Sequence, residues 1–180
     1  MKRKTTKELL VESFRELAQN RTIDKITIKD IVDNCEYSSA TFYRHFKDKY
    51  DLIAWAYSQD IEIVISKVIQ AEKSWKESLF ETAKYYSEHK EYLENLLLHT
   101  SGYDAFVLNM TEINYKALMK MMVKAGGPVD DEMKMVIRIY VSGTVCLTCE
   151  WILGRYKVSP ESLAQAYIQA IPELIGKYLC

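Results

Sequence analysis

Residues 39–46 combine small, aromatic and basic side chains in a short segment that could read a nucleic acid. Phe42 and Phe46 are four positions apart, so on a helix both can face inward and anchor it. The remaining side chains are then free to meet DNA, and an arginine can donate two parallel hydrogen bonds to a guanine. The spacing therefore predicts a DNA-reading helix that offers Ser39, Ala40, Thr41, Tyr43, Arg44 and His45.

Three predicted elements hold this helix in place. Residues 5–20 carry apolar side chains at three- and four-residue spacing, which predicts an amphipathic helix. Thr27, with Asp30 three residues later, forms a capping-box pair at the start of a short second helix. A turn over residues 35–38 separates that helix from residues 39–46. Two helices of about eight residues cannot bury a core alone, so the longer helix completes a three-helix helix-turn-helix unit.

The rest of the chain is predicted to be helical as well. Lys47 and Lys49 come at the start of the next helix, where exposed amides and positive charge suit a phosphate. We expect that helix to run from residue 48 to about 73, with later breaks near 89–90, 101–102 and 125–128. Further helices are predicted over 131–153 and from 160 to about 179. Three prolines and six glycines are too few for an all-β chain.

The fold class is therefore predicted to be all-α. Residues 1–50 form an N-terminal three-helix helix-turn-helix DNA-binding domain. Residues 51–180 form a helical-bundle domain for effector binding and dimerisation. The first fifty residues carry eleven Lys and Arg against eight Asp and Glu, whereas the whole chain has a net charge of −1. This mild asymmetry favours an anionic partner at the N-terminal end.

Residues 27–53 resemble the signature of the TetR family of transcriptional regulators. The string Thr-Phe-Tyr-Arg-His-Phe-x-x-Lys-x-x-Leu, at residues 41–52, is specific, because chance matches to all its positions should be rare. The resemblance implies contacts to DNA phosphates by Thr27, Thr41, Tyr43, His45 and Lys49, and base contacts by Ser39, Ala40 and Arg44.

The same resemblance implies what the protein does. Family members are transcriptional regulators, often repressors, that bind palindromic double-stranded operator DNA as homodimers. A small-molecule effector, whose identity the sequence leaves open, would modulate the affinity for DNA. Residues 153–160, after Trp151, look like the C-terminal domain of a Firmicutes-type branch of the family, which includes regulators of dihydroxyacetone-kinase operons.

Two positions depart from the family pattern. Glu36 stands in the turn where Gly is usual, because the backbone there is often left-handed; a non-glycine residue costs on the order of 1 kcal/mol. Its carboxylate also brings negative charge towards DNA. Ala40 stands where Gly is frequent, and its methyl group could meet a thymine methyl. Glu36 and the balanced net charge keep an alternative open: a co-regulator that acts through a protein partner, with weak or no direct DNA binding.

Dimerisation is predicted from the two C-terminal helices. The helix over 131–153 is apolar on most sides, so it must be covered on several of them. With the final helix it could form a four-helix interface whose two-fold symmetry matches a palindrome. A purely intramolecular core is the alternative. The candidate interface residues are Val141, Thr144, Trp151, Ala166 and Ala170.

Effector-binding residues are expected among aromatic side chains, several with polar tips, as ligand pockets often use. Ordinary core packing is the alternative interpretation for each of them. The candidates are Trp75, Tyr86, Tyr103, Phe106 and Tyr115, with Tyr85 and Tyr92 in the same group.

No cofactor, metal or catalytic centre is predicted. Cys146 and Cys149 have C-x-x-C spacing, but a zinc site needs four ligands and no second pair stands nearby, so both are expected to be packing residues. No nucleotide-binding glycine loop, Gly-x-Ser-x-Gly or His-Glu-x-x-His motif is present, and we do not expect an enzyme. Without a visible secretory signal or a run of about 18 apolar residues, the protein is expected to be cytoplasmic and not to enter a membrane.

Overall fold

The computed structural model describes residues 4–70, 72–99 and 103–179, without the side chains of residues 103–105. Within these ranges the regular structure is helical and contains no strand, which confirms the all-α class. The elements are α1 (Thr6–Ala18), the 3₁₀ turn η1 (Ile23–Lys25), α2 (Ile28–Asn34), α3 (Ser39–His45), α4 (Lys49–Ile69), α5 (Trp75–Glu88), α6 (Lys90–His99), α7 (Tyr103–Lys124), α8 (Asp131–Ile152), α9 (Pro160–Gln169) and α10 (Glu173–Leu179).

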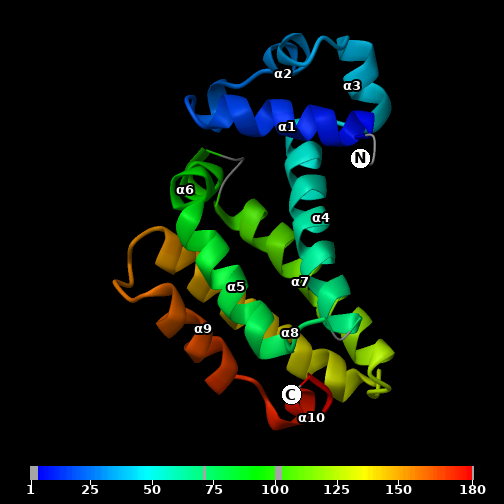
Figure 1. The fold of residues 1–180 in the computed structure, drawn as a ribbon, viewed down its shortest axis with the longest axis vertical. Coiled ribbons are helices and arrows are strands. Elements are labelled where there is room, and N and C mark those ends of the chain that lie inside the picture. Colours follow the sequence, from blue (N-terminus) through cyan, green and yellow to red (C-terminus); the bar gives the residue numbers. More distant parts are fainter. Residues whose placement is uncertain (1–3, 71, 100–102, 180) are drawn as a thin grey trace.

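The first three helices form a small unit at one end of the molecule (Figure 1). Helix α1 lies across the top of α4, and α4 runs from this unit down the side of the remaining helices. There α4 packs on α7, α7 on α8, and α5 on α9. Helix α4 is therefore the element that both parts of the molecule share.

Side chains cap several of the helix starts, and the cap of α2 is the predicted one. Thr27 caps α2, and the Asp30 carboxylate accepts hydrogen bonds from the Thr27 amide at 2.8 Å and the Thr27 hydroxyl at 2.6 Å. These bonds, led by the one from the hydroxyl, hold the pKa of Asp30 well below its usual range. Ser38 caps α3, and Ser159 caps α9 with Pro160 in the first turn.

The core of the N-terminal unit is aromatic and aliphatic. Phe42 and Phe46 are buried as predicted, and the Phe46 ring contacts that of Trp55 on α4 with 5.8 Å between centroids. The Lys7 ammonium of α1 lies 5.2 Å from the centroids of both the Phe46 and Trp55 rings. This cluster joins α1, the end of α3 and α4, and so fixes the direction in which α3 faces.

Helix α2 ends on a left-handed residue that is not glycine. Glu36 has a φ of 58°, and the Glu36 and Tyr37 amides donate to the carbonyls of Asp33 and Val32. This is the Schellman pattern, in which the left-handed position favours glycine. Helices α7 and α8 end in the same way, and there the left-handed residues are Gly126 and Gly154. The structure thus confirms the left-handed backbone expected at Glu36.

The C-terminal segment differs from the prediction of one helix over residues 160–179. Helix α9 ends at Gln169 and α10 begins at Glu173. Pro172 lies between them; it has no amide hydrogen for a helix bond and disfavours helical backbone at the residue before it. The predicted end of α4 near residue 73 was also too late, because α4 stops at Ile69.

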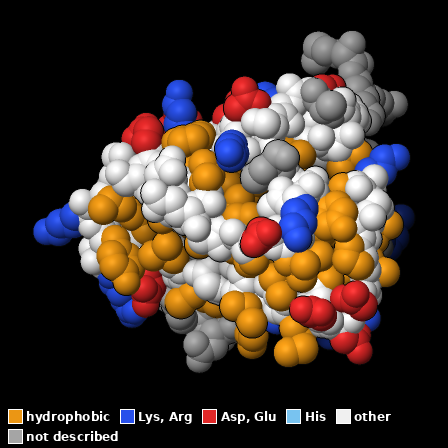
Figure 2. Space-filling model, turned by 90° about the horizontal axis from the view of Figure 1, so that it is seen from below, with side chains coloured by type: hydrophobic (Ala, Val, Ile, Leu, Met, Phe, Trp, Pro, Cys, Tyr) orange, Lys and Arg blue, Asp and Glu red, His pale blue; other side chains and the backbone are white. Residues whose placement is uncertain are grey.

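Helix α8 is long and apolar enough to cross a membrane by length and composition alone, with a mean hydropathy of 1.3 over its most apolar window. Of that window, 44% is buried within the described part of the chain. The helix packs against α7 and α10, and Met133, Ile137 and Ile152 are fully buried. A core position in a helical bundle accounts for this composition. At the end of the molecule where α10 lies, the surface carries hydrophobic side chains between charged ones (Figure 2).

We expect Glu36→Gly to stabilise the protein, because glycine adopts the left-handed backbone without a Cβ penalty. The free energy of unfolding should rise by about 1 kcal/mol in urea denaturation. Glu36→Ala is the matched control, since it removes the carboxylate but keeps Cβ, and it should give no such gain. Equal stability of the two variants would contradict a strained Glu36.

Candidate functional site

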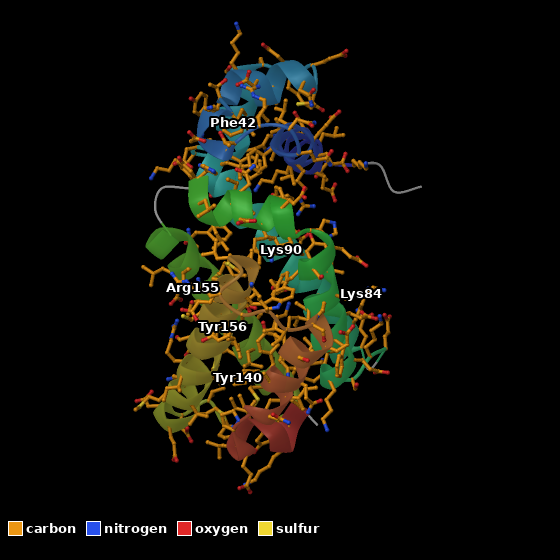
Figure 3. All side chains as sticks on the ribbon, turned by 90° about the vertical axis from the view of Figure 1, so that its left-hand side faces the viewer. Phe42, Lys84, Lys90, Tyr140, Arg155 and Tyr156 are labelled. Atoms are coloured by element: carbon orange, nitrogen blue, oxygen red, sulfur yellow. The ribbon has the colours of Figure 1, made fainter. Side chains whose placement is uncertain are left out.

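One face of α3 is open to solvent and the other is fixed in the core. The exposed side chains are those of Ser39, Ala40, Tyr43 and Arg44, and Tyr43 is 60% exposed. Thr41 and His45 are half-buried. Phe42 is fully buried beneath them, and its label in Figure 3 lies within the N-terminal unit. The predicted contact residues of this helix therefore share one accessible surface.

A small hydrogen-bond network organises this surface. The hydroxyl oxygens of Ser38 and Thr41 are 3.0 Å apart, and the Ser38 hydroxyl accepts from the Thr41 amide at 3.1 Å. The Arg44 guanidinium donates to the Thr41 hydroxyl at 3.0 Å. Arg44 uses few of its five donors here, so it keeps a guanidinium edge for an acceptor outside the protein.

Lys49 has a role that the sequence did not indicate. Its ammonium donates to the carbonyls of Ile23, Asp24 and Ile26 at 2.8, 3.1 and 2.9 Å. An ammonium has three hydrogens, so these carbonyls occupy all of its donors. Lys49 thereby fixes the turn that leads to Thr27, whose side chain is exposed. Any phosphate contact by Lys49 would have to share or replace one of these bonds. Near the N-terminus, Lys4 pairs with Glu12 at 2.6 Å.

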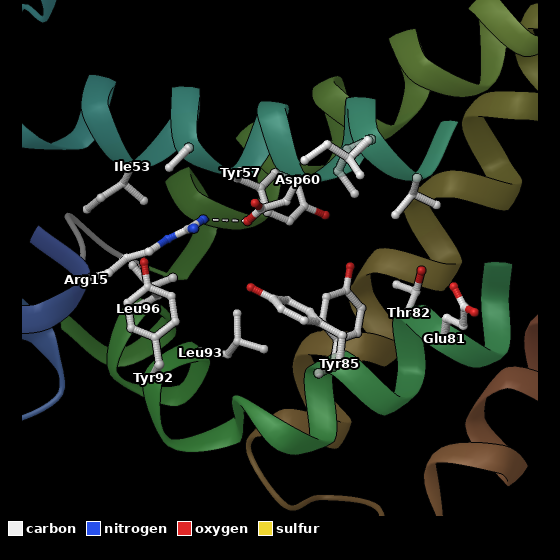
Figure 4. Close-up of a pocket in the computed structure, with 15 residues that line it drawn as sticks. Arg15, Ile53, Tyr57, Asp60, Glu81, Thr82, Tyr85, Tyr92, Leu93 and Leu96 are labelled. Carbon is white, nitrogen blue, oxygen red and sulfur yellow. Dashed lines mark hydrogen bonds and ion pairs between the residues drawn. The ribbon is translucent and has the colours of Figure 1, made fainter. Parts of the chain in front are cut away.

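A cavity of about 300 Å³ lies between α1, α4, α5 and α6 (Figure 4). This size is at the lower end of ligand pockets, which span roughly 300–1,000 Å³. Its walls are mostly aliphatic and aromatic, with a few polar groups. The lining residues are Arg15, Ile53, Ala56, Tyr57, Asp60, Ile61, Ile63, Val64, Glu81, Thr82, Tyr85, Tyr86, Tyr92, Leu93 and Leu96.

An ion pair between two helices forms the polar part of this cavity. The Arg15 guanidinium on α1 lies 2.6 Å from the Asp60 carboxylate on α4, and each side chain is about one-third exposed. Burial raises the pKa of Asp60, while the neighbouring Arg15 opposes that rise. Among the described residues, the buried Nε of Arg15 has no hydrogen-bond partner.

The tyrosines around the cavity are neutral at physiological pH. Burial raises the pKa of both Tyr57 and Tyr92 to about 12, and raises that of Tyr86 well above its usual value. The Tyr57 hydroxyl accepts a hydrogen bond from the Asn114 amide at 2.7 Å. These phenols can therefore donate and accept hydrogen bonds without adding charge.

The predicted effector residues are only partly brought together. Tyr86 lines the cavity, as do Tyr85 and Tyr92. Trp75 instead lines a smaller cavity of about 80 Å³, which shares Tyr57, Thr82 and Tyr86 with the first. Phe106 is buried but lines neither cavity. Tyr115 also lines neither cavity, and the Arg138 guanidinium lies 3.8 Å from its ring centroid. The Tyr103 side chain is not among those that the structure describes.

Arg15 and Asp60 were not predicted as site residues, although their positions among apolar residues could have indicated them. Asp60 interrupts an apolar stripe of α4 that includes Ile53, Ala56 and Val64. Arg15 similarly follows Val11 by four positions on the buried side of α1. A single charged residue inside an apolar stripe indicates a partner across a cavity or an interface.

The predicted dimer residues need a correction. Val141 and Trp151 are 3% and 5% exposed within a single chain, and the Trp151 indole donates to the Val158 carbonyl at 2.9 Å. They therefore belong to the chain's own core. Because α8 is apolar nearly all round, its sequence could not show which face stays free. Thr144 and Ala166 are half-buried and Ala170 is exposed.

The exposed face of α8 carries other residues. Met135 and Ile139 are 65% and 71% exposed, and Gly143 and Cys146 follow on the same side of the helix. Cys149, three positions after Cys146, is fully buried, and burial raises the pKa of its thiol to about 12. Within the described part of the chain no group of three His, Cys, Asp or Glu residues could hold a metal.

Comparisons with known proteins agree with this architecture. The family model "Bacterial regulatory proteins, tetR family" matches residues 10–55, and the model "Transcriptional regulator C-terminal region" matches residues 73–172. The dhaKLM operon transcriptional activator DhaS of Lactococcus lactis is 21% identical over 174 residues, 96% of this chain and 90% of that protein.

Solved structures share the fold. A dihydroxyacetone kinase operon activator DhaS superposes with a TM-score of 0.60 at 18% identity, over 97% of this chain and 98% of that one. A FadR of Thermus thermophilus, described as a TetR family transcriptional repressor in complex with lauroyl-CoA, has a TM-score of 0.64 at 14% identity, over 92% of each chain.

We expect Lys49→Ala to destabilise the protein, because three backbone carbonyls lose a charged donor. The free energy of unfolding should fall by about 1–2 kcal/mol. Lys47→Ala is the control: its side chain is exposed, and surface changes of this kind usually stay within about 0.5 kcal/mol. If the two variants unfold at the same urea concentration, the ammonium does not hold the turn.

Proposed function

The chain belongs to the TetR family of bacterial transcriptional regulators, and we propose that it binds palindromic operator DNA as a homodimer through α3. A small molecule in the cavity beneath α1 would modulate this binding. The observation that carries the proposal is the exposed face of α3 over a fully buried Phe42. Residues 1–50 would act as the DNA-binding domain and residues 51–180 as the domain for effector binding and dimerisation.

The side chains on α3 suit two kinds of DNA contact. The exposed Arg44 can donate a bidentate pair to guanine, and the small Ser39 and Ala40 let the helix backbone approach base edges. Tyr43 and the exposed Thr27 offer hydroxyls to phosphates, with Thr41 and His45 at the margin of the same surface. We retain Lys49 as a phosphate contact only through an exchange of one of its carbonyl bonds.

The exposed face of α8 is the surface we propose for the dimer. Met135 and Ile139 supply apolar area there, and Gly143 lets a second helix approach closely. An added methyl group at Gly143 would meet nothing within 4 Å, so this face is open in the single chain. Ala170, Ala166 and Thr144 remain candidates at its border. Two-fold pairing would place two copies of α3 on half-sites about one turn of DNA, roughly 34 Å, apart.

The cavity supports an effector of modest size. Its apolar walls with a few polar groups are typical of small-molecule sites. The FadR of similar fold was solved in complex with lauroyl-CoA, a ligand that carries an apolar acyl chain.

Repression is the mode of action that we propose, since a dimer on an operator can block a promoter. In a reporter strain carrying the protein's own upstream region, removal of the regulator should then raise expression. A fall in expression would instead indicate activation, the role named for the lactococcal relative. As a regulator of transcription it would act in the cytoplasm.

A second candidate is a co-regulator that acts through a protein partner. The exposed Glu36 beside α3 and the net charge of −1 favour it. A gel-shift assay with the pure dimer and its own upstream DNA at low salt separates the two proposals. A shifted band supports the operator-binding regulator, whereas no shift supports the co-regulator.

For α3, we expect Tyr43→Ala to weaken binding to all DNA sequences alike, because a phosphate contact carries no sequence information. Arg44→Ala should relax the preference at one base position, by about 1–3 kcal/mol of discrimination. Fluorescence anisotropy against the operator and its single-base variants measures both effects. Unchanged affinity and unchanged preference in both variants would mean that another surface reads the DNA.

For α8, Ile139→Asp should separate the dimer, because it places a charge in the centre of an apolar interface. Sedimentation at micromolar concentration should give the mass of two chains for the wild type and of one for the variant. Leu98→Asp, at an exposed apolar residue of α6, is the control and should stay dimeric. A monomeric wild type would rule out the proposed interface.

A further inference from the structure

Two hollows of different character meet at the Arg15–Asp60 ion pair. The inner one is the cavity of about 300 Å³ described above. The outer one is a groove of about 1,020 Å³ between the end of α1 and the α5–α6 corner. Four residues line both of them, namely Arg15, Asp60, Tyr85 and Tyr92. The inner cavity is mainly apolar, so these four form a polar mouth between it and the groove.

The mouth has an unused hydrogen-bond donor. The guanidinium of Arg15 has five N–H groups, and its Nη2 donates to Asp60 at 2.6 Å. Its Nε is buried and has no partner among the residues that the structure describes. A buried donor without an acceptor is unfavourable, so the mouth favours a ligand that brings an acceptor.

We propose that the cavity binds an amphipathic anion, whose carboxylate pairs with Arg15 in place of Asp60 while its apolar tail occupies the inner cavity. This rests on the proposed function, since it names the chemical class of the effector for the same site. Arg15 is suited to this role because a guanidinium can bind a carboxylate through two parallel hydrogen bonds. The volume of the inner cavity suits a tail of medium length.

Other classes of ligand fit the mouth less well. A cation would need Asp60, and taking it would leave the Arg15 guanidinium without its counter-charge. Glu81, the second carboxylate of the lining, already pairs with Lys73. A neutral alcohol could accept a hydrogen bond but could not neutralise Arg15, so it would have to bind with the ion pair intact.

The exchange would also change the connection between the two parts of the molecule. Arg15 belongs to α1 and Asp60 to α4, so the ion pair links the helix-turn-helix unit to the cavity wall. Burial raises the pKa of Asp60 and Arg15 opposes that rise, so loss of Arg15 as a partner would raise the pKa of this carboxyl further. Ligand binding and the position of α1 are then coupled through one side chain.

The test compares three probes that share a tail and differ in the head group: decanoate, decanol and decyltrimethylammonium. Calorimetric titration of the full chain should give affinity for decanoate about ten-fold or more above that for the other two. Arg15→Gln should weaken decanoate binding by a similar factor and leave decanol binding unchanged. Asp60→Asn should strengthen decanoate binding, because it removes the competing carboxylate; such a gain cannot result from misfolding. Arg155→Gln, at an exposed pair with Glu150, is the control and should bind like the wild type.

The outcomes that contradict the proposal distinguish a wrong ligand class from a cavity that binds no effector. Equal affinity for decanoate and decanol, or a preference for the cation, would overturn the anion while leaving the cavity as an effector site. A loss of decanoate binding in Asp60→Asn would also overturn it, because the carboxylate would then be supporting the ligand. Failure of all three probes to bind, both to the wild type and to Asp60→Asn, would count against the anion and against an effector in this cavity.

Discussion

The ion pair between Arg15 and Asp60 is the interaction on which the coupling of the two parts of this molecule depends. It is short, at 2.6 Å, and it lies at the edge of a mostly apolar cavity, where electrostatic attraction is stronger than in water. A second polar connection lies nearby. The Asn95 side chain of α6 donates to the carbonyls of Ala18 and Arg21 and accepts from the Ile23 amide. Both connections end on α1 or the turn after it, so a change in the cavity wall reaches the helix-turn-helix unit through defined atoms.

Helix α4 serves both parts. Its first turns hold the N-terminal unit through Leu52, the Trp55 ring and the Lys49 ammonium. From Ile53 to Val64 it also forms one wall of the cavity. Since one rigid helix carries both sets of contacts, displacement of its cavity side would alter the orientation of α3. The buried Phe42 and Phe46 make this possible, because they keep α3 fixed relative to α4 while its outer face stays open.

Local chemistry in the sequence predicted much of the helical framework. Thr27, Ser38 and Ser159 cap helices through bonds within a few residues, and Phe42 and Phe46 are buried as their spacing predicts. Pro172 shows how a single residue can divide an apparently continuous pattern. The free face of α8 could not be predicted, since apolar residues surround that helix and only tertiary packing decides which of them stay exposed. The cavity could not be predicted either, because its lining comes from four helices far apart in the sequence.

The most direct test of coupling between the cavity and α3 is amide hydrogen exchange of the full chain with and without operator DNA. Coupling between two sites is reciprocal, so DNA bound at α3 must affect the cavity if the cavity affects DNA binding. We expect altered protection on α1 around Arg15 and along residues 53–64 of α4, in addition to the DNA-contacting region. Changes confined to residues 27–49 would contradict this coupling, because DNA binding at α3 would then leave the ion pair and the cavity wall unchanged.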